Sequence, residues 1–197
     1  MAKPQKDKTD RRIYKTRKNL KATLVALMSE QPFEKINIKM LCDRASTSRV
    51  TFYTYYDDKY DLLQDVFLDM NSSAVTHFKA LQAQNNPGDD FSLCLQNLLD
   101  AILTSEQETF CSPQYLLRNT DTILFYYRFL TRNIEQFEVA FPQKMKTRYP
   151  VHQLNAFLAV GLWSFLHEDG SAEIAPDSRR YANNLIHDLV NSDIFRA

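Results

Sequence analysis

The sequence is poor in glycine and holds only three among its 197 residues, at positions 88, 161 and 170. A phosphate-binding loop or a series of tight hairpins needs several glycines, so the scarcity argues against nucleotide-fold enzymes and all-β sandwiches. No apolar run approaches the ~20 residues that span a bilayer. The polar, charged N-terminus does not resemble a signal peptide. We therefore expect a cytoplasmic protein that does not associate with membranes.

Features of catalytic and metal sites are also scarce. The three cysteines are odd in number and lack C-x-x-C spacing, which predicts reduced, mostly buried thiols. His167, Glu168 and Asp169 are consecutive and cannot share one helix face, so we interpret them as a solvated helix end. No serine or cysteine nucleophile has an identifiable base partner. We expect no metal, no cofactor and no enzymatic activity.

Charge is distributed unevenly along the chain although the total is zero. Residues 1–60 hold 14 Lys and Arg against 7 Asp and Glu, and the remaining residues hold 10 against 17. Such a split suggests a basic head that meets a polyanion and an acidic body that does not. The alternative is a solvated, lysine-rich surface helix.

Apolar residues recur at helical spacing through most of the chain, and no alternating stretch demands a strand. The pattern predicts an all-α protein of about nine helices. The first begins at Asp10 and ends before Pro32, and the next two have Asn37 and Ser48 as N-caps. Asp58 opens a long fourth helix. The later helices are expected behind Asp89 or Asp90, at a capping box from Ser105 to Glu108, from Asp121 to about Phe141, over 151–167 and from near Pro176.

Residues 10–56 have the pattern of a helix-turn-helix unit, with 48–56 as the recognition helix. Phe52 and Tyr56 are four residues apart and can anchor inward. Arg49 can bridge the O6 and N7 atoms of guanine, and Thr51 can meet thymine or phosphate. The backbone-contacting candidates, which lie at helix N-termini or carry long polar side chains, are Asn37, Ser48, Tyr53, Tyr55 and Lys59. Alternatively, the tyrosines are core or surface aromatics.

The segment from Lys15 to Leu63 resembles the DNA-binding part of TetR-type transcriptional regulators. The shared features are a basic helix, then FEKI at 33–36, LCDRA at 41–45 and TFY…Y…K…LL from Thr51 to Leu63. In the turn, where the family usually has glycine, this sequence has Ser46. The resemblance implies DNA contacts at Lys39, Arg49, Val50, Thr51, Tyr53, Thr54, Tyr55 and Lys59.

The resemblance also implies a domain organisation. We expect a mobile basic tail over residues 1–9, a DNA-binding domain over 10–58 and a helical effector-binding and dimerisation domain over 59–197, connected through a long helix that starts near residue 58. Clustered aromatics are candidates either for an effector pocket, as is usual in this family, or for plain core packing. They are Phe110, Tyr115, Tyr126, Tyr127, Phe129 and Phe137.

The segment 151–167 is apolar on more than one face, so it needs cover on two sides. We expect it to pack with the last helix against a second copy of the chain in a four-helix bundle. Gly161 fits a close helix crossing there, although packing within one subunit is an alternative. The interface candidates are Leu154, Phe157, Leu158, Gly161, Phe165, Leu185 and Leu189.

These features together predict a homodimeric repressor that binds a near-palindromic DNA operator and is released by a small-molecule effector. The alternative is a helix-turn-helix adaptor that works through a protein partner and needs no effector.

Overall fold

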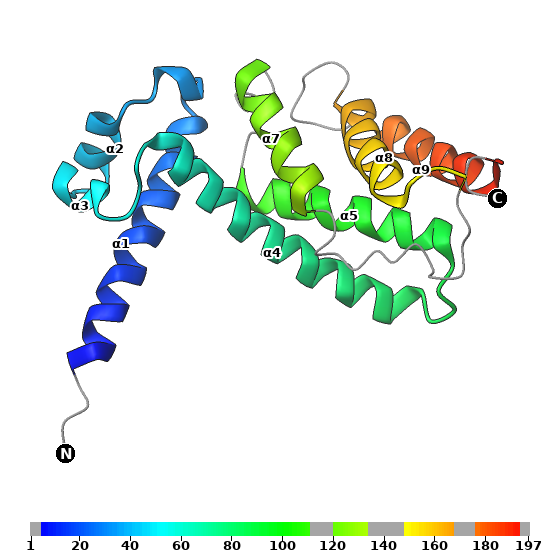
Figure 1. The fold of residues 1–197 in the computed structure, drawn as a ribbon, viewed down its shortest axis with the longest axis horizontal. Helices are drawn as coiled ribbons and strands as arrows, with labels where there is room; N and C mark the ends of the chain where they lie inside the picture. Colours follow the sequence, from blue (N-terminus) through cyan, green and yellow to red (C-terminus); the bar gives the residue numbers. More distant parts are fainter. Residues whose placement is uncertain (1–4, 111–119, 134–147, 168–175, 194–197) are drawn as a thin grey trace. The chain divides into compact units, whose positions relative to one another are not determined.

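The computed structural model describes residues 5–110, 120–133, 148–167 and 176–193 (Figure 1). These residues form eight α-helices, one short 3-10 helix and no strand, so the all-α prediction is confirmed. The chain divides into two compact units, Met1–Leu68 and Asp69–Ala197. The division falls ten residues beyond the boundary that the sequence predicts, inside a continuous helix.

The first unit contains α1 (Gln5–Met28), the 3-10 helix η1 (Phe33–Lys35), α2 (Ile38–Arg44), α3 (Arg49–Tyr53) and the start of α4 (Lys59–Asn85). Helix α1 begins at Gln5, five residues before the predicted start. The predicted tail over residues 1–9 is therefore helical from residue 5. Apolar periodicity begins only later in the helix, whereas Gln and Lys have good helix propensity and can extend the helix toward its N-terminus.

Three of the predicted helix starts are confirmed by their caps. The Asn37 side chain accepts a hydrogen bond from the Met40 N–H at 3.0 Å, and Ser48 accepts one from the Thr51 N–H at 3.0 Å. Asp58 accepts the N–H groups of Tyr60 and Asp61. Each cap satisfies an amide that has no partner within its helix.

The turn between α2 and α3 is a Schellman motif. The Thr47 N–H donates to the Cys42 carbonyl at 3.0 Å and the Ser46 N–H to the Asp43 carbonyl at 3.3 Å. Ser46 occupies the left-handed position of the motif with φ 50°, where glycine is usual. The Asn19 side chain of α1 donates to the Ala45 carbonyl at 2.8 Å and holds the turn against α1.

The core of the first unit draws on every one of its helices. Leu24 of α1, Leu41 of α2, Phe52 of α3 and Leu63 of α4 are all fully buried. Helix α3 is too short to be stable alone, so its position depends on the burial of Phe52 and on the contacts of the residues that follow it.

The second unit holds the rest of α4, then α5 (Phe91–Thr109), α7 (Thr120–Asn133), α8 (Val151–Leu166) and α9 (Pro176–Asn191). Within it α8 packs against α5, α7 and α9, and α9 packs against α5. Asp90 caps α5 by accepting the Leu93 N–H at 2.8 Å, as the sequence predicts. Figure 1 shows α8 and α9 side by side.

One predicted helix start is wrong. Residues 105–108 do not open a sixth helix but lie in the last turns of α5, where Ser105 and Glu106 are buried. A capping box requires its first residue at an exposed helix start, whereas here the apolar face of α5 continues through Ala101 and Ile102 to Phe110. The end of the predicted helix Asp121–Phe141 lies outside the described residues beyond Asn133.

Candidate nucleic-acid interface

Helix α3 presents two opposite surfaces. Phe52 is fully buried, whereas Val50 is 78% exposed and Tyr53 is 57% exposed. Arg49, at the first position of the helix, is exposed as well. A five-residue helix that buries one aromatic side chain and exposes an arginine, a valine and a tyrosine has the shape required of a major-groove reader.

The other predicted contact residues differ in their solvent exposure and in the hydrogen bonds that they already form. Asn37, Lys39 and Ser48 are exposed, and Tyr55 is half-buried. The Thr54 hydroxyl donates to the Val50 carbonyl at 2.9 Å, and the hydroxyls of Thr51 and Ser48 are 2.8 Å apart. Their hydroxyl groups are thus already used locally, although Thr54 remains exposed.

Lys59, a predicted phosphate contact, has hydrogen-bond partners within the first unit. Its ammonium donates to the carbonyls of Phe33 at 2.9 Å, Glu34 at 3.2 Å and Ile36 at 2.9 Å. It also lies 4.5 Å from the centre of the Phe33 ring. An ammonium has three N–H donors, so these carbonyls satisfy all of them. Burial lowers the pKa of this lysine.

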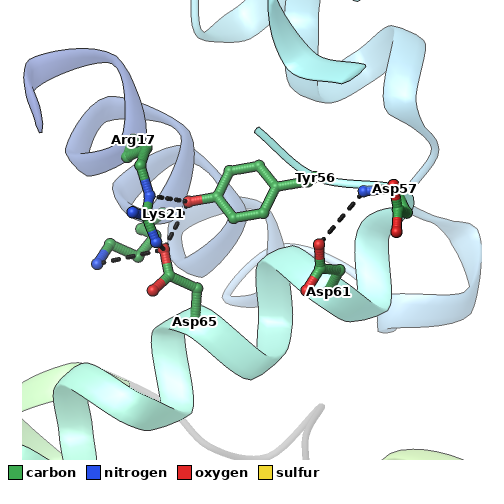
Figure 2. A network of polar contacts seen from close by, with 6 residues as sticks. All are labelled: Arg17, Lys21, Tyr56, Asp57, Asp61 and Asp65. Carbon is green, nitrogen blue, oxygen red and sulfur yellow. Dashed lines mark hydrogen bonds and ion pairs between the residues drawn. The ribbon is translucent and has the colours of Figure 1, made fainter. Parts of the chain in front are cut away.

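A polar cluster joins α1, the segment after α3 and α4 (Figure 2). The Tyr56 hydroxyl donates to the Asp65 Oδ2 atom at 2.6 Å. Arg17 donates to the same oxygen at 3.0 Å, and the Lys21 ammonium lies 3.5 Å from it. Arg17 also donates to the Tyr56 oxygen at 3.4 Å.

The charges in this cluster are set by burial and by neighbours. Burial opposes ionisation of Asp65, but the Tyr56 hydrogen bond and the cations Lys21 and Arg17 outweigh it, so the pKa of Asp65 lies below its usual value. Burial and the Asp65 hydrogen bond raise the pKa of Tyr56. The cluster therefore contains a carboxylate, two cations and a neutral phenol at neutral pH.

The pattern of exposed contact residues does not reveal this cluster. Lys21, one of the basic residues of α1, is paired with Asp65. The sequence feature that could have revealed the cluster is the position of Asp65 between the apolar residues Leu63 and Val66, which are buried in α4. A charged residue on a packing face requires a partner.

The second unit buries part of the predicted aromatic cluster. Phe110, Tyr126 and Phe129 are buried and Tyr127 is half-buried, while Tyr115 and Phe137 lie outside the described residues. The rings of Tyr126 and Tyr127 stand edge-on to Trp163 at 5.4 and 5.3 Å.

A carboxyl group that the sequence reasoning missed lies beside these rings. Glu106 is only 2% exposed, and burial raises its pKa to about 7 against the opposing hydrogen bond from Trp163. His167 stacks on Trp163 and is buried, with its Nε2 atom 3.9 Å from Glu106. The interpretation of His167 as part of a solvated helix end is therefore wrong. The helix ends there, but its last side chain points into the core.

The predicted dimer residues of α8 divide between two faces. Leu154 and Leu158 are buried within the unit, whereas Phe157 is 63% exposed and Phe165 is 39% exposed. Gly161 lies on the exposed face, where an added Cβ would meet nothing within 4 Å. On α9, Leu185 and Leu189 are half-buried, and Tyr181 is exposed.

Other classes of site were sought in the same residues. Among the described side chains, no three His, Cys, Asp or Glu residues are grouped so that they could hold a metal ion. No helix in the described part of the chain has the length and apolarity needed to cross a membrane. Cys42 and Cys94 are buried free thiols, as predicted, while Cys111 lies outside the described residues.

Comparison with known proteins agrees with the geometry of the first unit. The family described as "Bacterial regulatory proteins, tetR family" matches residues 21–66. A Bacillus subtilis (strain 168) protein, named as the uncharacterized HTH-type transcriptional regulator YxbF, is 35% identical over 51 residues. That match covers 26% of this chain and only 13% of the length of the relative. The segment that carries α2, α3 and their supporting core is thus similar to the N-terminal region of TetR-family regulators.

Proposed function

We propose that the protein is a DNA-binding transcriptional regulator that acts in the cytoplasm. The observation that carries this proposal is the exposed surface of α3, where Arg49, Val50 and Tyr53 face solvent while Phe52 anchors the helix. Exposed apolar and aromatic side chains that are neighbours on one helix mark a surface that can bind a partner. Next to an arginine, a base edge with a thymine methyl provides one. We propose contacts from Asn37, Lys39, Ser48, Arg49, Val50, Thr51, Tyr53, Thr54 and Tyr55.

The acting species is proposed to be a homodimer on a near-palindromic operator. One recognition helix of five residues reads only a few base pairs. Two DNA-binding units are therefore needed for a useful ratio of operator affinity to random-DNA affinity. The exposed face of α8 with Phe157, Gly161 and Phe165 supports a two-fold interface, since an apolar helix face is stable when a second copy covers it. Tyr181 of α9 is exposed and can extend it.

Regulation is proposed to be repression that a small molecule relieves. The supporting observation is the group of buried aromatic side chains in the second unit, Tyr126, Phe129 and Trp163, of which Trp163 donates to the carboxyl group of Glu106. An effector bound there shifts the population between two states only to the extent that it prefers one of them. The second unit is thus the proposed effector-binding body.

The experiment that tests the proposal is selection of genomic fragments with the purified protein, followed by titration of a selected duplex and a random duplex in increasing salt. A regulator of this kind enriches a two-fold-related sequence, and its affinity falls steeply with salt. Enrichment of no sequence would overturn the proposal. It would favour an adaptor that uses the same α3 surface for a protein partner.

A further inference from the structure

The inference rests on the proposed DNA binding and concerns Asp65, a residue of α4 outside the recognition helix. One carboxylate oxygen of Asp65 receives the Tyr56 hydroxyl at 2.6 Å and Arg17 at 3.0 Å, with Lys21 at 3.5 Å (Figure 2). We propose that Asp65 is a positioning residue that raises the sequence preference of DNA binding. It fixes Tyr56 behind the recognition helix, and it withdraws Arg17 and Lys21 from sequence-independent attraction to phosphate.

Tyr56 is mechanically connected to α3. The N–H groups of Tyr55 and Tyr56 donate to the Phe52 carbonyl at 2.9 and 3.0 Å, and the rings of Phe52 and Tyr56 lie 5.7 Å apart. The chain from Phe52 to Tyr56 therefore moves as one piece. A helix of five residues is not stable alone, so its orientation depends on contacts with other helices. We infer that the hydrogen bond of the Tyr56 hydroxyl to Asp65 is a main contact of this kind.

The charges of the cluster affect the non-specific affinity for DNA. Arg17 is exposed at its side chain to 45%, so it is close to solvent as well as to Asp65. Non-specific DNA affinity increases with the number of cations that can replace counterions on phosphate. A carboxylate that pairs with both cations reduces this background attraction, while the exposed face of α3 still reads bases. Specificity is a ratio, and it rises when the background falls.

Three substitutions separate the two effects. Tyr56→Phe removes the hydroxyl without a change of charge. Asp65→Asn removes one negative charge and leaves Tyr56 only a neutral amide oxygen as acceptor. The control is Glu30→Gln, which makes the same change of charge in the same unit, because exposed Glu30 forms a two-point pair with Arg44 at 2.7 Å and takes no part in the Tyr56 cluster.

The measurement is the affinity of each purified full-length protein for the selected duplex and for a random duplex over a range of salt. Tyr56→Phe should lower the ratio of the two affinities by about tenfold, the loss of one charge-assisted hydrogen bond, without changing the salt slope. Asp65→Asn should also lower the ratio, because its random-duplex affinity rises as the salt slope steepens by about one. Glu30→Gln should raise both affinities together and keep the ratio.

Each outcome decides the matter. Thermal unfolding of each variant establishes that it is folded at the assay temperature. If Asp65→Asn does not fold, Tyr56→Phe still tests the positioning role, because it keeps the buried ring and removes only the hydroxyl. If Tyr56→Phe keeps the wild-type ratio, the positioning role is wrong. If Asp65→Asn binds random DNA no more tightly than wild type while Glu30→Gln does, the withdrawal of Arg17 and Lys21 is wrong. A wild-type protein without any sequence preference overturns the proposed function itself.

Discussion

Trp163 of α8 donates its indole N–H to the buried carboxyl group of Glu106 on α5, at 3.3 and 3.2 Å from the two oxygens. The carboxyl group that receives this N–H is almost fully buried. The same indole is stacked by His167 and met edge-on by Tyr126 and Tyr127. Glu106 is consequently protonated more readily in the folded than in the unfolded chain.

The stability of the second unit should depend on pH through Glu106. Its pKa is about 7 in the folded protein and about 4.3 in an unfolded chain, so the folded state retains a proton that the unfolded state releases. The contribution is fully present below about pH 4.3 and is lost as the pH rises to about 7, on the order of 3 kcal/mol. Glu106→Gln should flatten this dependence, as measured by chemical unfolding at several pH values. Equal slopes for both proteins would contradict it.

Ser46→Gly should stabilise the first unit. Ser46 has φ 50° in the Schellman turn, a conformation that costs a residue with a Cβ about 1 kcal/mol more than it costs glycine. The melting temperature should rise accordingly, and the DNA affinity should be retained. Thr47→Gly is the matched control because its backbone is outside the left-handed region. A gain from Thr47→Gly, or a loss from Ser46→Gly, would show that the turn is not strained.

Lys59→Met should destabilise the protein without changing the salt slope of DNA binding. The substitution leaves the carbonyls of Phe33, Glu34 and Ile36 without the ammonium that they share, a loss of about 1–3 kcal/mol. Lys39→Ala, which removes an exposed lysine, should do the reverse and reduce the salt slope by about one. Denaturant unfolding and salt titration of both variants decide between the two roles. A reduced slope in Lys59→Met would restore Lys59 as a phosphate contact.

Arg49→Ala should reduce discrimination between the selected duplex and single-base variants of it. An arginine that binds the O6 and N7 atoms of guanine contributes about 1–3 kcal/mol of preference. The loss should be confined to one base position in each half-site, because the rest of the α3 face is unchanged. Competition binding against a panel of single-base variants measures this effect. A uniform loss across the panel would assign Arg49 to phosphate instead.

Gly161→Leu should reduce dimerisation while most of the helical content is retained. The side chain would meet open space within the subunit, so any loss of assembly must come from a second copy that approaches closely. Sedimentation at several concentrations together with circular dichroism measures both quantities. Gly88→Leu is the control, since Gly88 also faces open space but lies in the loop between α4 and α5. A monomeric wild type at micromolar concentration would refute the α8 interface.

The sequence by itself determined the elements of the first unit. Asn37, Ser48 and Asp58 are caps whose side chains bond to amides three residues further along the chain, and such local bonds follow from residue type and spacing. Phe52 and Tyr56 are both buried, as their four-residue spacing predicts, although Tyr56 lies beyond the end of α3. The all-α class required no more than the same periodicity.

Tertiary structure decided which polar side chains meet. The contacts of Lys59 with the Phe33 carbonyl, of Asp65 with Arg17 and of Glu106 with Trp163 join residues 26, 48 and 57 positions apart. Spacing along a helix carries no information about such pairs, because they depend on how separate helices cross. For the same reason the sequence placed Ser105 at a helix start: an isolated capping pattern looks alike at an exposed end and in a buried turn, and only packing distinguishes the two.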